Sequence, residues 1–448
     1  MNILSQVKQK KILILGLGRE GLSTYLFLRK QFPDKILTLA DKFSLNELPK
    51  SSQVQIAKDK KVKLSLGKGY LKEVRGFDLV FVTPGISDTI LEKVKETQTI
   101  ISTNLELFFE LFKGKIIGVT GTKGKSTTAS LIFHVLKQSG LNAILAGNIG
   151  EPALSYLDDI NSDSLVVLEL SSFQLMRFKK SPYIAVIQNI VPEHLDYHLS
   201  FKKYVEAKTN IVNYQTKNDF VIYNSTSILA TEIAQKSRAK KISFSLFSKE
   251  FEKTILPIKS IPLRGKFNLQ NIIPAILIGR LLGISDKKIG LAIKNFKPLE
   301  HRLEFIRSID GVEYYNDSLS TIPESAIAAI ETFPDKYKVL ILGGYDRGLD
   351  FKKLAKVIYS AKIRGIILFP TTGKKIWEVI KKIFKNKNLP QSKFVTNMKD
   401  AVKQVFSWAK KGDVVLLSPA SPSFSGFKDY KDRGDQFKKE VLNLQQKT

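Results

Sequence analysis

Apolar, strand-like runs alternate with helical patterns along almost the whole chain. The first run, at 11–15, is followed by a helical pattern at 22–30 and then by a second strand-like run at 36–40. Strands that alternate with helices in this way form parallel sheets with helices packed on their faces. The sequence therefore predicts an α/β protein, and its 448 residues are too many for one compact core.

Three blocks of this alternation predict three domains, at 1–103, 104–299 and 300–448. A long helix that ends near Gly283 should precede a loop at 296–300, which closes the central block. We expect a sheet in each block. Further strands of the central and last blocks are expected at 115–119, 165–170, 184–190, 312–315, 338–342, 365–369 and 414–417.

The composition limits the metals and the cellular setting that the chain can use. Because the chain has no cysteine, disulfides and thiolate zinc sites are excluded, and a metal must be bound by oxygen or imidazole ligands. No apolar run approaches the roughly 20 residues of a membrane-spanning helix, and the first residues lead into a strand instead of a signal peptide. We therefore expect a cytoplasmic protein without membrane insertion, with magnesium as its metal.

The formal net charge of +29 comes largely from lysines that are scattered over the whole chain. They form neither a basic tail nor an arginine-rich stretch. A solvated, lysine-rich surface is therefore favoured over a nucleic-acid-binding module, which would bind in a salt-dependent way. We expect no nucleic-acid partner, although a polyphosphate substrate would benefit from the charge.

Residues 118–127, Gly-Val-Thr-Gly-Thr-Lys-Gly-Lys-Ser-Thr, lie between a buried-looking strand and an amphipathic helix expected at 127–138. Glycines allow backbone N–H groups to face phosphate oxygens, Lys125 can reach the terminal phosphates, and the Ser126 hydroxyl can bind magnesium. The generic motif requires glycine at Val119, whereas the earlier glycine is Gly118. The alternative is a turn without a ligand, but we favour ATP binding. The residues predicted to bind ATP here are Gly121, Thr122, Lys123, Gly124, Lys125, Ser126 and Thr127.

A second glycine loop, Gly-Leu-Gly-Arg-Glu-Gly at 16–21, follows the first strand, and Asp41 lies about twenty residues further on. Taken alone, this is a dinucleotide-binding fingerprint, and it predicts a nicotinamide-dependent dehydrogenase. A tight strand-to-helix turn without a ligand is the alternative, because an isolated motif of this kind is weak evidence.

Seven further motifs follow the phosphate loop at 118–127 along the chain. They are Gly-Asn-Ile-Gly at 147–150, Glu-Leu-Ser-Ser-Phe-Gln-Leu at 169–175, Glu-His-Leu-Asp at 193–196, Ala-Lys at 207–208, Asn-Leu-Gln-Asn at 268–271, His-Arg at 301–302 and Asn-Asp-Ser at 316–318. In content and order this set resembles the Mur ligases, and the resemblance covers the whole chain. The motifs Thr-Pro-Gly-Ile at 83–86 and Leu-Ser-Pro-Ala at 417–420 are most similar to the branch that adds D-glutamate to UDP-N-acetylmuramoyl-L-alanine.

The resemblance implies three domains with separate tasks: a Rossmann-like UDP-binding domain, a central P-loop ATPase-like domain with a parallel sheet, and a C-terminal Rossmann-like domain for the amino acid. It implies ATP-dependent ligation through an acyl phosphate, in which Lys125 and Asn148 orient the γ-phosphate. The implied UDP-precursor residues are Gly16, Gly18, Asp41, Thr83, Pro84 and Gly85. The implied additional ATP residues are Asn268, Asn271, Arg302 and Asp317.

The resemblance also implies two magnesium sites. Glu169 and His194 follow apolar strands, where ligands of a parallel sheet belong, and they join Ser126 as expected metal ligands. Lys208 would otherwise be taken for a solvated lysine of a helix at 201–212. In the family the matching lysine is carbamylated, which converts a cation into an oxygen ligand. His194 and Lys208 are therefore expected in catalysis as well as in metal binding.

The amino-acid pocket departs from the family pattern at two positions. Leu319 and Arg347 stand where the glutamate-adding ligases have lysine. This pair resembles a variant branch that adds L-glutamate, so L-glutamate is the alternative substrate, with D-glutamate favoured. The implied glutamate residues are Thr321, Arg347, Ser423, Phe424 and Tyr430. A folylpolyglutamate synthase is a further alternative that shares the ATP motifs, but the UDP-type block at the start of this chain argues against it. We expect the protein to be a monomer.

Overall fold

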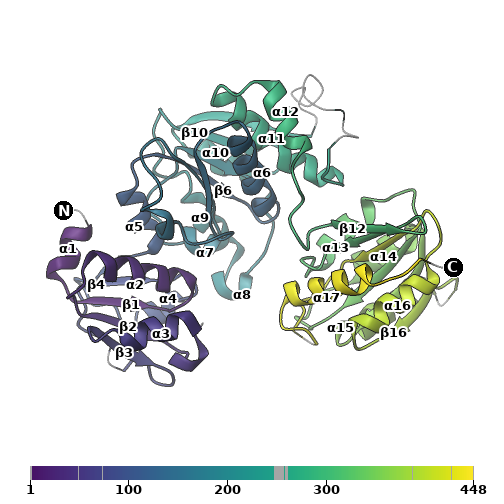
Figure 1. Cartoon of the computed structure of the whole chain (residues 1–448), viewed down its shortest axis with the longest axis horizontal. Helices are drawn as coiled ribbons and strands as arrows, with labels where there is room; N and C mark the ends of the chain where they lie inside the picture. The colour runs from purple at the N-terminus through teal and green to yellow at the C-terminus, as the bar shows by residue number, and fades with distance from the viewer. Residues whose placement is uncertain are drawn as a thin grey trace. The chain divides into compact units, whose positions relative to one another are not determined.

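The computed structural model describes residues 3–48, 50–72, 74–246, 257, 261–385, 387–424 and 426–446. Its described strands form three separate sheets, and helices cover their faces (Figure 1). The chain divides into two compact units, one made of 1–256 with 270–293 and the other of 257–269 with 294–448. The first two sheets belong to the first unit, and the third sheet forms the second.

The first sheet has the strand order β3-β2-β1-β4-β5, and all its paired strands are parallel. Its strands are β1 (Ile12–Leu15), β2 (Leu37–Asp41), β3 (Val62–Leu66), β4 (Leu79–Val82) and β5 (Ile100–Ser102). Its helices are α1 (Ile3–Gln9), α2 (Arg19–Gln31), η1 (Leu45–Glu47), α3 (Lys50–Lys58) and α4 (Asp88–Leu91). The chain reverses its direction of strand addition between β1 and β4, which is the position where ligands bind to sheets of this kind.

The second sheet is also parallel, with the order β11-β10-β9-β6-β8-β7. Its strands are β6 (Lys115–Thr120), β7 (Ala143–Gly147), β8 (Leu165–Glu169), β9 (Ile184–Ile187), β10 (Phe220–Asn224) and β11 (Lys240–Phe244). Its helical segments are α5 (Asn104–Leu111), α6 (Lys125–Gln138), η2 (Ala153–Tyr156), α7 (Ser172–Leu175), α8 (Leu195–His198), α9 (Phe201–Thr209), α10 (Ile228–Gln235), α11 (Lys266–Leu281) and α12 (Asp286–Lys294).

The third sheet has the order β12-β13-β17-β14-β15-β16, in which only the β12–β13 pair is antiparallel. Its strands are β12 (Glu304–Ile309), β13 (Val312–Asn316), β14 (Lys338–Gly343), β15 (Ile363–Phe369), β16 (Gln391–Phe394) and β17 (Val414–Leu417). The helices are α13 (Pro323–Glu331), α14 (Lys352–Ser360), α15 (Thr372–Ile383), α16 (Met398–Trp408) and α17 (Tyr430–Leu442). Residues of α13, α14 and α15 share one core cluster, and residues of α16 and α17 share another with the opposite face of the strands.

The α/β class and the three sheets confirm the predicted fold. The predicted limit near 300 lies a few residues after Lys294, where the longer of the two segments of the second unit begins. The limit near 104 falls between two sheets of one unit. Independent folding of 1–103 and 104–299 stays a prediction. Local limits differ more at the phosphate loop: Gly118 lies inside β6, and α6 begins at Lys125 instead of Thr127.

Candidate active site

The phosphate loop is the four-residue turn from Gly121 to Gly124, between β6 and α6. Its two glycines have φ angles of 148° and 85°, which L side chains rarely adopt. A Cβ atom on Gly124 would lie 2.2 Å from Asn271 Oδ1, and one on Gly121 would lie 2.6 Å from Gln188 Cβ. Both positions therefore require glycine, and Asn271 of α11 packs directly against the loop.

Hydrogen bonds fix the loop to the neighbouring strand ends. Thr122 donates its N–H to Asn189 O at 2.7 Å, and its hydroxyl lies 2.8 Å from the Tyr204 hydroxyl. Lys125 Nζ donates to Thr122 O at 2.9 Å, so its cationic end lies over the loop at the start of α6. Lys123 instead pairs with Glu193 at 2.6 Å. The N-terminus of α6 and Lys125 together form a phosphate-binding environment.

A buried carboxylate lies at the ends of β7 and β8, beside this loop in the second sheet. Glu169 is 2% exposed, and its Oε1 accepts a hydrogen bond from Asn148 Nδ2 at 3.0 Å. Its Oε2 is buried and has no hydrogen-bond partner among the described residues. An unpartnered buried oxygen of this kind is costly, and a bound cation would satisfy it. The donor set therefore fits a metal, and the predicted residues Glu169 and Asn148 lie together.

Lys208 of α9 lies beneath the phosphate loop and is 1% exposed. Its Nζ donates to Gly121 O at 2.8 Å and lies 3.4 Å from Thr120 Oγ1. Burial lowers the pKa of Lys208 well below its usual value; Lys125 lowers it further, against the opposing effects of Glu193 and Glu169. A neutral amine at this place can act as a nucleophile, as the predicted carbamate requires.

His194 and Ser126 complete the predicted metal ligands. His194 is the residue before α8, with φ at 55°, and its side chain is 46% exposed, 3.9 Å from Glu193 Oε2. Ser126 lies in the first turn of α6 and is half-buried. Within the described part of the chain, no group of three or more His, Cys, Asp and Glu side chains could hold a metal ion. A magnesium site here needs other oxygen ligands, such as a hydroxyl, phosphate oxygens or a carbamate.

The first glycine loop is a tight turn that only glycine permits. A Cβ atom on Gly16 would lie 2.0 Å from Thr83 Oγ1, and one on Gly21 would lie 1.9 Å from Gly16 O. Asp41 is buried and accepts hydrogen bonds from the N–H groups of Leu17 at 2.5 Å and Phe43 at 2.9 Å. The predicted residues Gly16, Asp41 and Thr83 therefore meet at one place, where Asp41 braces the turn, while Gly18 has open space around it.

Three residues of the second sheet's loops and helices contact the first sheet, and the sequence assigned none of them a role. Tyr197 donates its hydroxyl hydrogen to Pro84 O at 2.9 Å, and Arg177 donates to Ile86 O at the same distance. Gln174 donates to Glu20 Oε1 at 2.6 Å, and burial raises the pKa of Glu20 to about 7. The contacts of Tyr197 and Arg177 hold the 83–86 loop. The motif at 169–175 included Gln174, but pattern alone could not show its partner.

In the second unit, the predicted ATP residue Asp317 is 6% exposed. It accepts hydrogen bonds from Ser418 Oγ at 2.8 Å, from Leu303 N–H at 3.0 Å and from the Ser320 hydroxyl. Burial raises the pKa of Asp317 to about 6. The half-buried Arg302 follows His301, which has a φ angle of 61°.

The two predicted asparagines lie one turn apart on α11. Asn271 contacts the phosphate loop, as described above, and accepts from Thr128 Oγ1 at 3.5 Å. Asn268 is 2% exposed and donates to Arg264 O at 2.6 Å. The boundary between the two units crosses α11 between these residues.

The predicted glutamate residues lie in loops that follow β13, β14 and β17. Arg347 is exposed, and its guanidinium carbon lies 5.9 Å from the centre of the Phe424 ring, itself 58% exposed. Ser423 is buried, Tyr430 begins α17 with its ring 6.0 Å from that of His301, and Thr321 is half-buried before α13. The sequence missed Arg433, which is fully buried under these loops.

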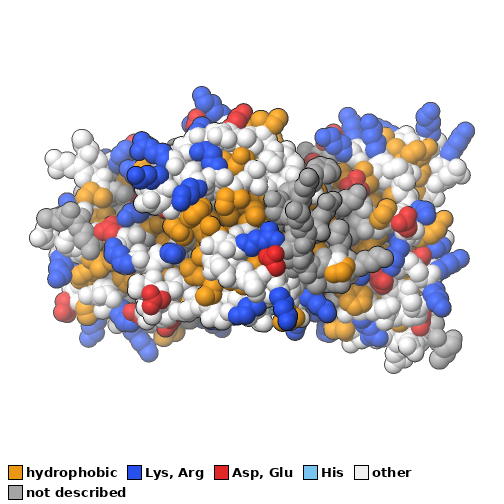
Figure 2. Space-filling view, turned by 90° about the horizontal axis from the view of Figure 1, so that it is seen from above, with side chains coloured by type: hydrophobic (Ala, Val, Ile, Leu, Met, Phe, Trp, Pro, Cys, Tyr) orange, Lys and Arg blue, Asp and Glu red, His pale blue; other side chains and the backbone are white. Residues whose placement is uncertain are grey.

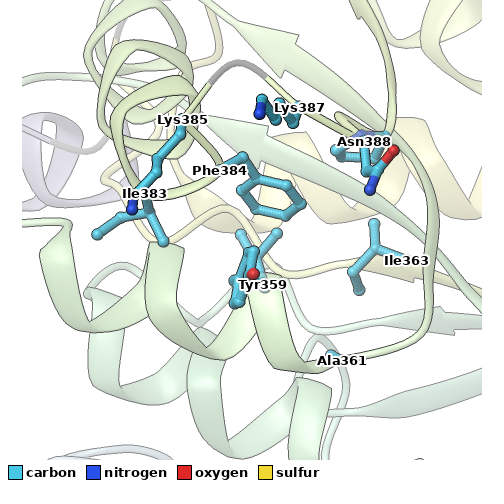
Figure 3. Close-up of a pocket in the computed structure, with 10 residues that line it drawn as sticks. Tyr359, Ala361, Ile363, Ile383, Phe384, Lys385, Lys387 and Asn388 are labelled. Carbon is cyan, nitrogen blue, oxygen red and sulfur yellow. The ribbon is translucent and has the colours of Figure 1, made fainter.

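A cavity of about 520 Å³ in the second unit lies elsewhere (Figure 3). Its lining includes Tyr359, Ile363 and Phe384, with Lys385 and Lys387 beside them. Ile363 begins β15, so the cavity lies at the end of the sheet opposite to the predicted glutamate residues. It therefore shares no residue with the candidate site.

Charge and hydropathy can be followed over the described surface and helices. Figure 2 shows lysine and arginine side chains spread over the visible face instead of gathered in one patch. Among the described residues, no helix is both long and apolar enough to cross a membrane.

Comparisons with known proteins cover both units. The family model described as Mur ligase middle domain matches residues 119–279, and the one described as Mur ligase, glutamate ligase domain matches 301–421. The UDP-N-acetylmuramoylalanine--D-glutamate ligase of Acetivibrio thermocellus is 36% identical over 98% of this chain and 97% of that protein. Two crystal structures from Thermotoga maritima share the fold. A UDP-N-acetylmuramate-alanine ligase matches with a TM-score of 0.60 and 18% identity, over 97% of this chain and 99% of that one. A MurF ligase in complex with ADP matches with a TM-score of 0.59 and 16% identity, over 97% of this chain and 96% of that one.

Proposed function

This chain belongs to the Mur ligase family, and we propose that it joins D-glutamate to UDP-N-acetylmuramoyl-L-alanine in an ATP-dependent step of peptidoglycan precursor synthesis. The Acetivibrio relative carries the name of that reaction and aligns over nearly the full length, including the first glycine loop. Family membership argues against the dehydrogenase and nucleic-acid alternatives. The alignment over the first sheet favours this ligase over a folylpolyglutamate synthase.

One observation carries the proposed chemistry: a phosphate loop, a buried carboxylate and a buried lysine with a lowered pKa lie side by side at one edge of the second sheet. The unpartnered Glu169 Oε2 supports a bound cation at this edge, and burial lowers the pKa of the neighbouring Lys208. A purely structural glutamate at this position would have a partner for both of its carboxylate oxygens within the protein.

In the proposed reaction, a carboxylate oxygen of the precursor attacks the γ-phosphorus of ATP, and ADP leaves. Lys125 and Asn148 orient and neutralise the transferred group. The amine of glutamate then attacks the acyl carbon of the acyl phosphate, loses a proton, and expels inorganic phosphate. The nucleotide is held by 121–127 together with Asn268, Asn271, Arg302 and Asp317.

We assign two magnesium ions to Ser126, Glu169, His194 and a carbamylated Lys208. Magnesium would neutralise phosphate charge. The carbamate forms when the neutral Nζ attacks carbon dioxide, an N–C bond forms and a proton leaves the nitrogen. The uridine diphosphate group is assigned to Gly16, Gly18, Asp41 and the 83–85 loop, at the switch point between β1 and β4.

Thr321, Arg347, Ser423, Phe424 and Tyr430 are proposed to bind glutamate. L-Glutamate is the second candidate because Leu319 removes one expected cation and Arg347 replaces another with a planar fork that can bind a carboxylate through two hydrogen bonds. We further propose that the enzyme acts as a cytoplasmic monomer with domains at 1–103, 104–299 and 300–448.

The test offers the purified protein ATP, magnesium and UDP-N-acetylmuramoyl-L-alanine with D-glutamate, L-glutamate or neither. Phosphate release and the ligated product are both measured. Product with D-glutamate is expected. Product with L-glutamate alone would assign specificity to Leu319 and Arg347, and no product with either would refute the proposed acceptor or donor.

A further inference from the structure

Arg433 of α17 is a buried cation without a countercharge. It is 0% exposed, and its three donors bind Ser318 Oγ at 3.0 Å, Ser318 O at 2.8 Å and Ser421 O at 3.0 Å. All three acceptors are neutral, and no ion pair to Arg433 exists among the described residues. Burial lowers the pKa of Arg433 to about 9, with no carboxylate opposing that effect. An uncompensated buried charge is costly and needs an explanation.

The guanidinium connects loops at the ends of three adjacent strands, β13, β17 and β14. Ser318 follows β13 and donates its hydroxyl hydrogen to Tyr430 O at 2.7 Å. Ser421 follows β17, and its hydroxyl lies 2.7 Å from Thr372 Oγ1. After β14, a Cβ atom on Gly344 would come within 3.2 Å of the Arg433 Nη1 atom. These loops are the ones that carry the glutamate residues proposed above.

A purely structural pin would not need a formal charge, because neutral amide donors also bind carbonyl and hydroxyl oxygens. Charge matters where a compensating anion arrives from outside. Glutamate brings two carboxylates and one ammonium group, and this chain has lost a cation at Leu319. The exposed Arg347 supplies one positive charge at the rim of the loops, and Arg433 supplies another beneath them.

We propose that Arg433 is a positioning residue for the amino-acid substrate: its buried charge favours an anionic side chain, and its hydrogen bonds hold the loops that bind it. The inference rests on the proposed glutamate-ligase function. Arg433 does not touch the substrate; it acts through Ser318, Ser421 and the electrostatic potential in a region of low dielectric.

The test compares glutamate with glutamine, a neutral analogue of nearly the same shape. Both amino acids are used as the enantiomer that the wild-type enzyme accepts. We measure the KM for glutamate and the inhibition constant of glutamine in the wild type, in Arg433→Met and in Arg433→Lys. Arg433→Met should lower the preference for glutamate over glutamine by about tenfold or more. The KM values for ATP and for the UDP precursor should stay within about twofold.

The matched control is Arg364→Met. Arg364 binds Asp413 through two hydrogen bonds, at 2.5 and 3.0 Å, at the opposite end of the same sheet. It should change stability without changing the glutamate preference. Equal loss of glutamate and glutamine binding in Arg433→Met, or an unchanged preference, would overturn the inference.

Arg433→Lys decides the question if the methionine variant does not fold. Lysine keeps the positive charge but lacks the planar guanidinium group that binds Ser318 and Ser421. The preference for glutamate should therefore persist, while the KM for glutamate and the inhibition constant of glutamine both rise. A lost preference in this variant would count against the role of the charge. Wild-type turnover with glutamate is measured separately, so failure of the proposed function is distinguishable from failure of this inference.

Discussion

Replacing Glu20 with glutamine should stabilise the first unit above pH 7. In the wild type, Glu20 Oε1 accepts from Gln174 Nε2 at 2.6 Å, whereas the buried Oε2 has no partner among the described residues. Burial raises the pKa of this carboxyl from 4.5 to about 7. The folded state therefore holds a proton that the unfolded state releases, and stability falls as the pH rises through this window.

The size of the effect follows from the difference between the two pKa values, 4.5 and about 7. At about 1.4 kcal/mol for each pH unit, the free energy of unfolding would fall by about 3 kcal/mol by the time the pH exceeds 7. Partial exposure of Glu20 reduces the expected value to about 1–2 kcal/mol. Glutamine can still accept from Gln174 with its carbonyl oxygen and carries no charge, so Glu20→Gln should show no such pH dependence.

The assay must report on the first unit, because both tryptophans, Trp377 and Trp408, lie in the second. Hydrogen exchange of peptides within 12–31, followed by mass spectrometry from pH 5 to pH 8, gives the local free energy of opening. Exposed Glu92→Gln on the same domain is the control. A difference between Glu20→Gln and wild type that does not grow with pH would refute the reasoning.

Three further changes test the site in the first unit. Lys125→Ala should reduce phosphate release about a hundredfold or more while precursor binding persists, as measured by turnover and calorimetry; retained turnover would contradict its role. Lys208→Ala should lose activity and regain part of it with acetate or propionate, and failure of the rescue would argue against a carbamate. Gly124→Ala should weaken ATP binding because the new Cβ atom would meet Asn271. The control is Gly140→Ala, which has a similar φ of 87° but open space around it, so that it reports only the backbone strain of about 1–3 kcal/mol. Equal ATP affinity in the two variants would show that the contact with Asn271 does not matter.

The fold was predictable because buried parallel strands are short, apolar and bounded by glycine or polar residues. The runs at 11–15, 36–40 and 414–417 match β1, β2 and β17 within one residue at each end. The phosphate loop was predictable as well, although its true start is Gly121, because Gly118 packs inside a strand, where its Cβ atom would lie 2.9 Å from Pro182 Cγ.

Burial of charged side chains was not predictable from pattern. Lys208 and Arg433 lie in helices that carry several other charged residues, so both look solvated in the sequence. The resemblance to Mur ligases alone pointed to Lys208. Gly434 was the available signal for Arg433: a Cβ atom there would lie 2.2 Å from His301 Nδ1, and a glycine inside a helix often marks close packing.

The order of strands in the third sheet has a consequence for synthesis of the protein. β17 lies between β13 and β14, yet it is the last strand of the sheet to leave the ribosome. Until it is made, β13 and β14 have open edges on the sides that face each other in the final sheet, and such edges can pair with other chains. The second unit therefore completes its sheet only after β17 has been translated. A chain that ends before residue 414 would leave the interior of this sheet open to aggregation.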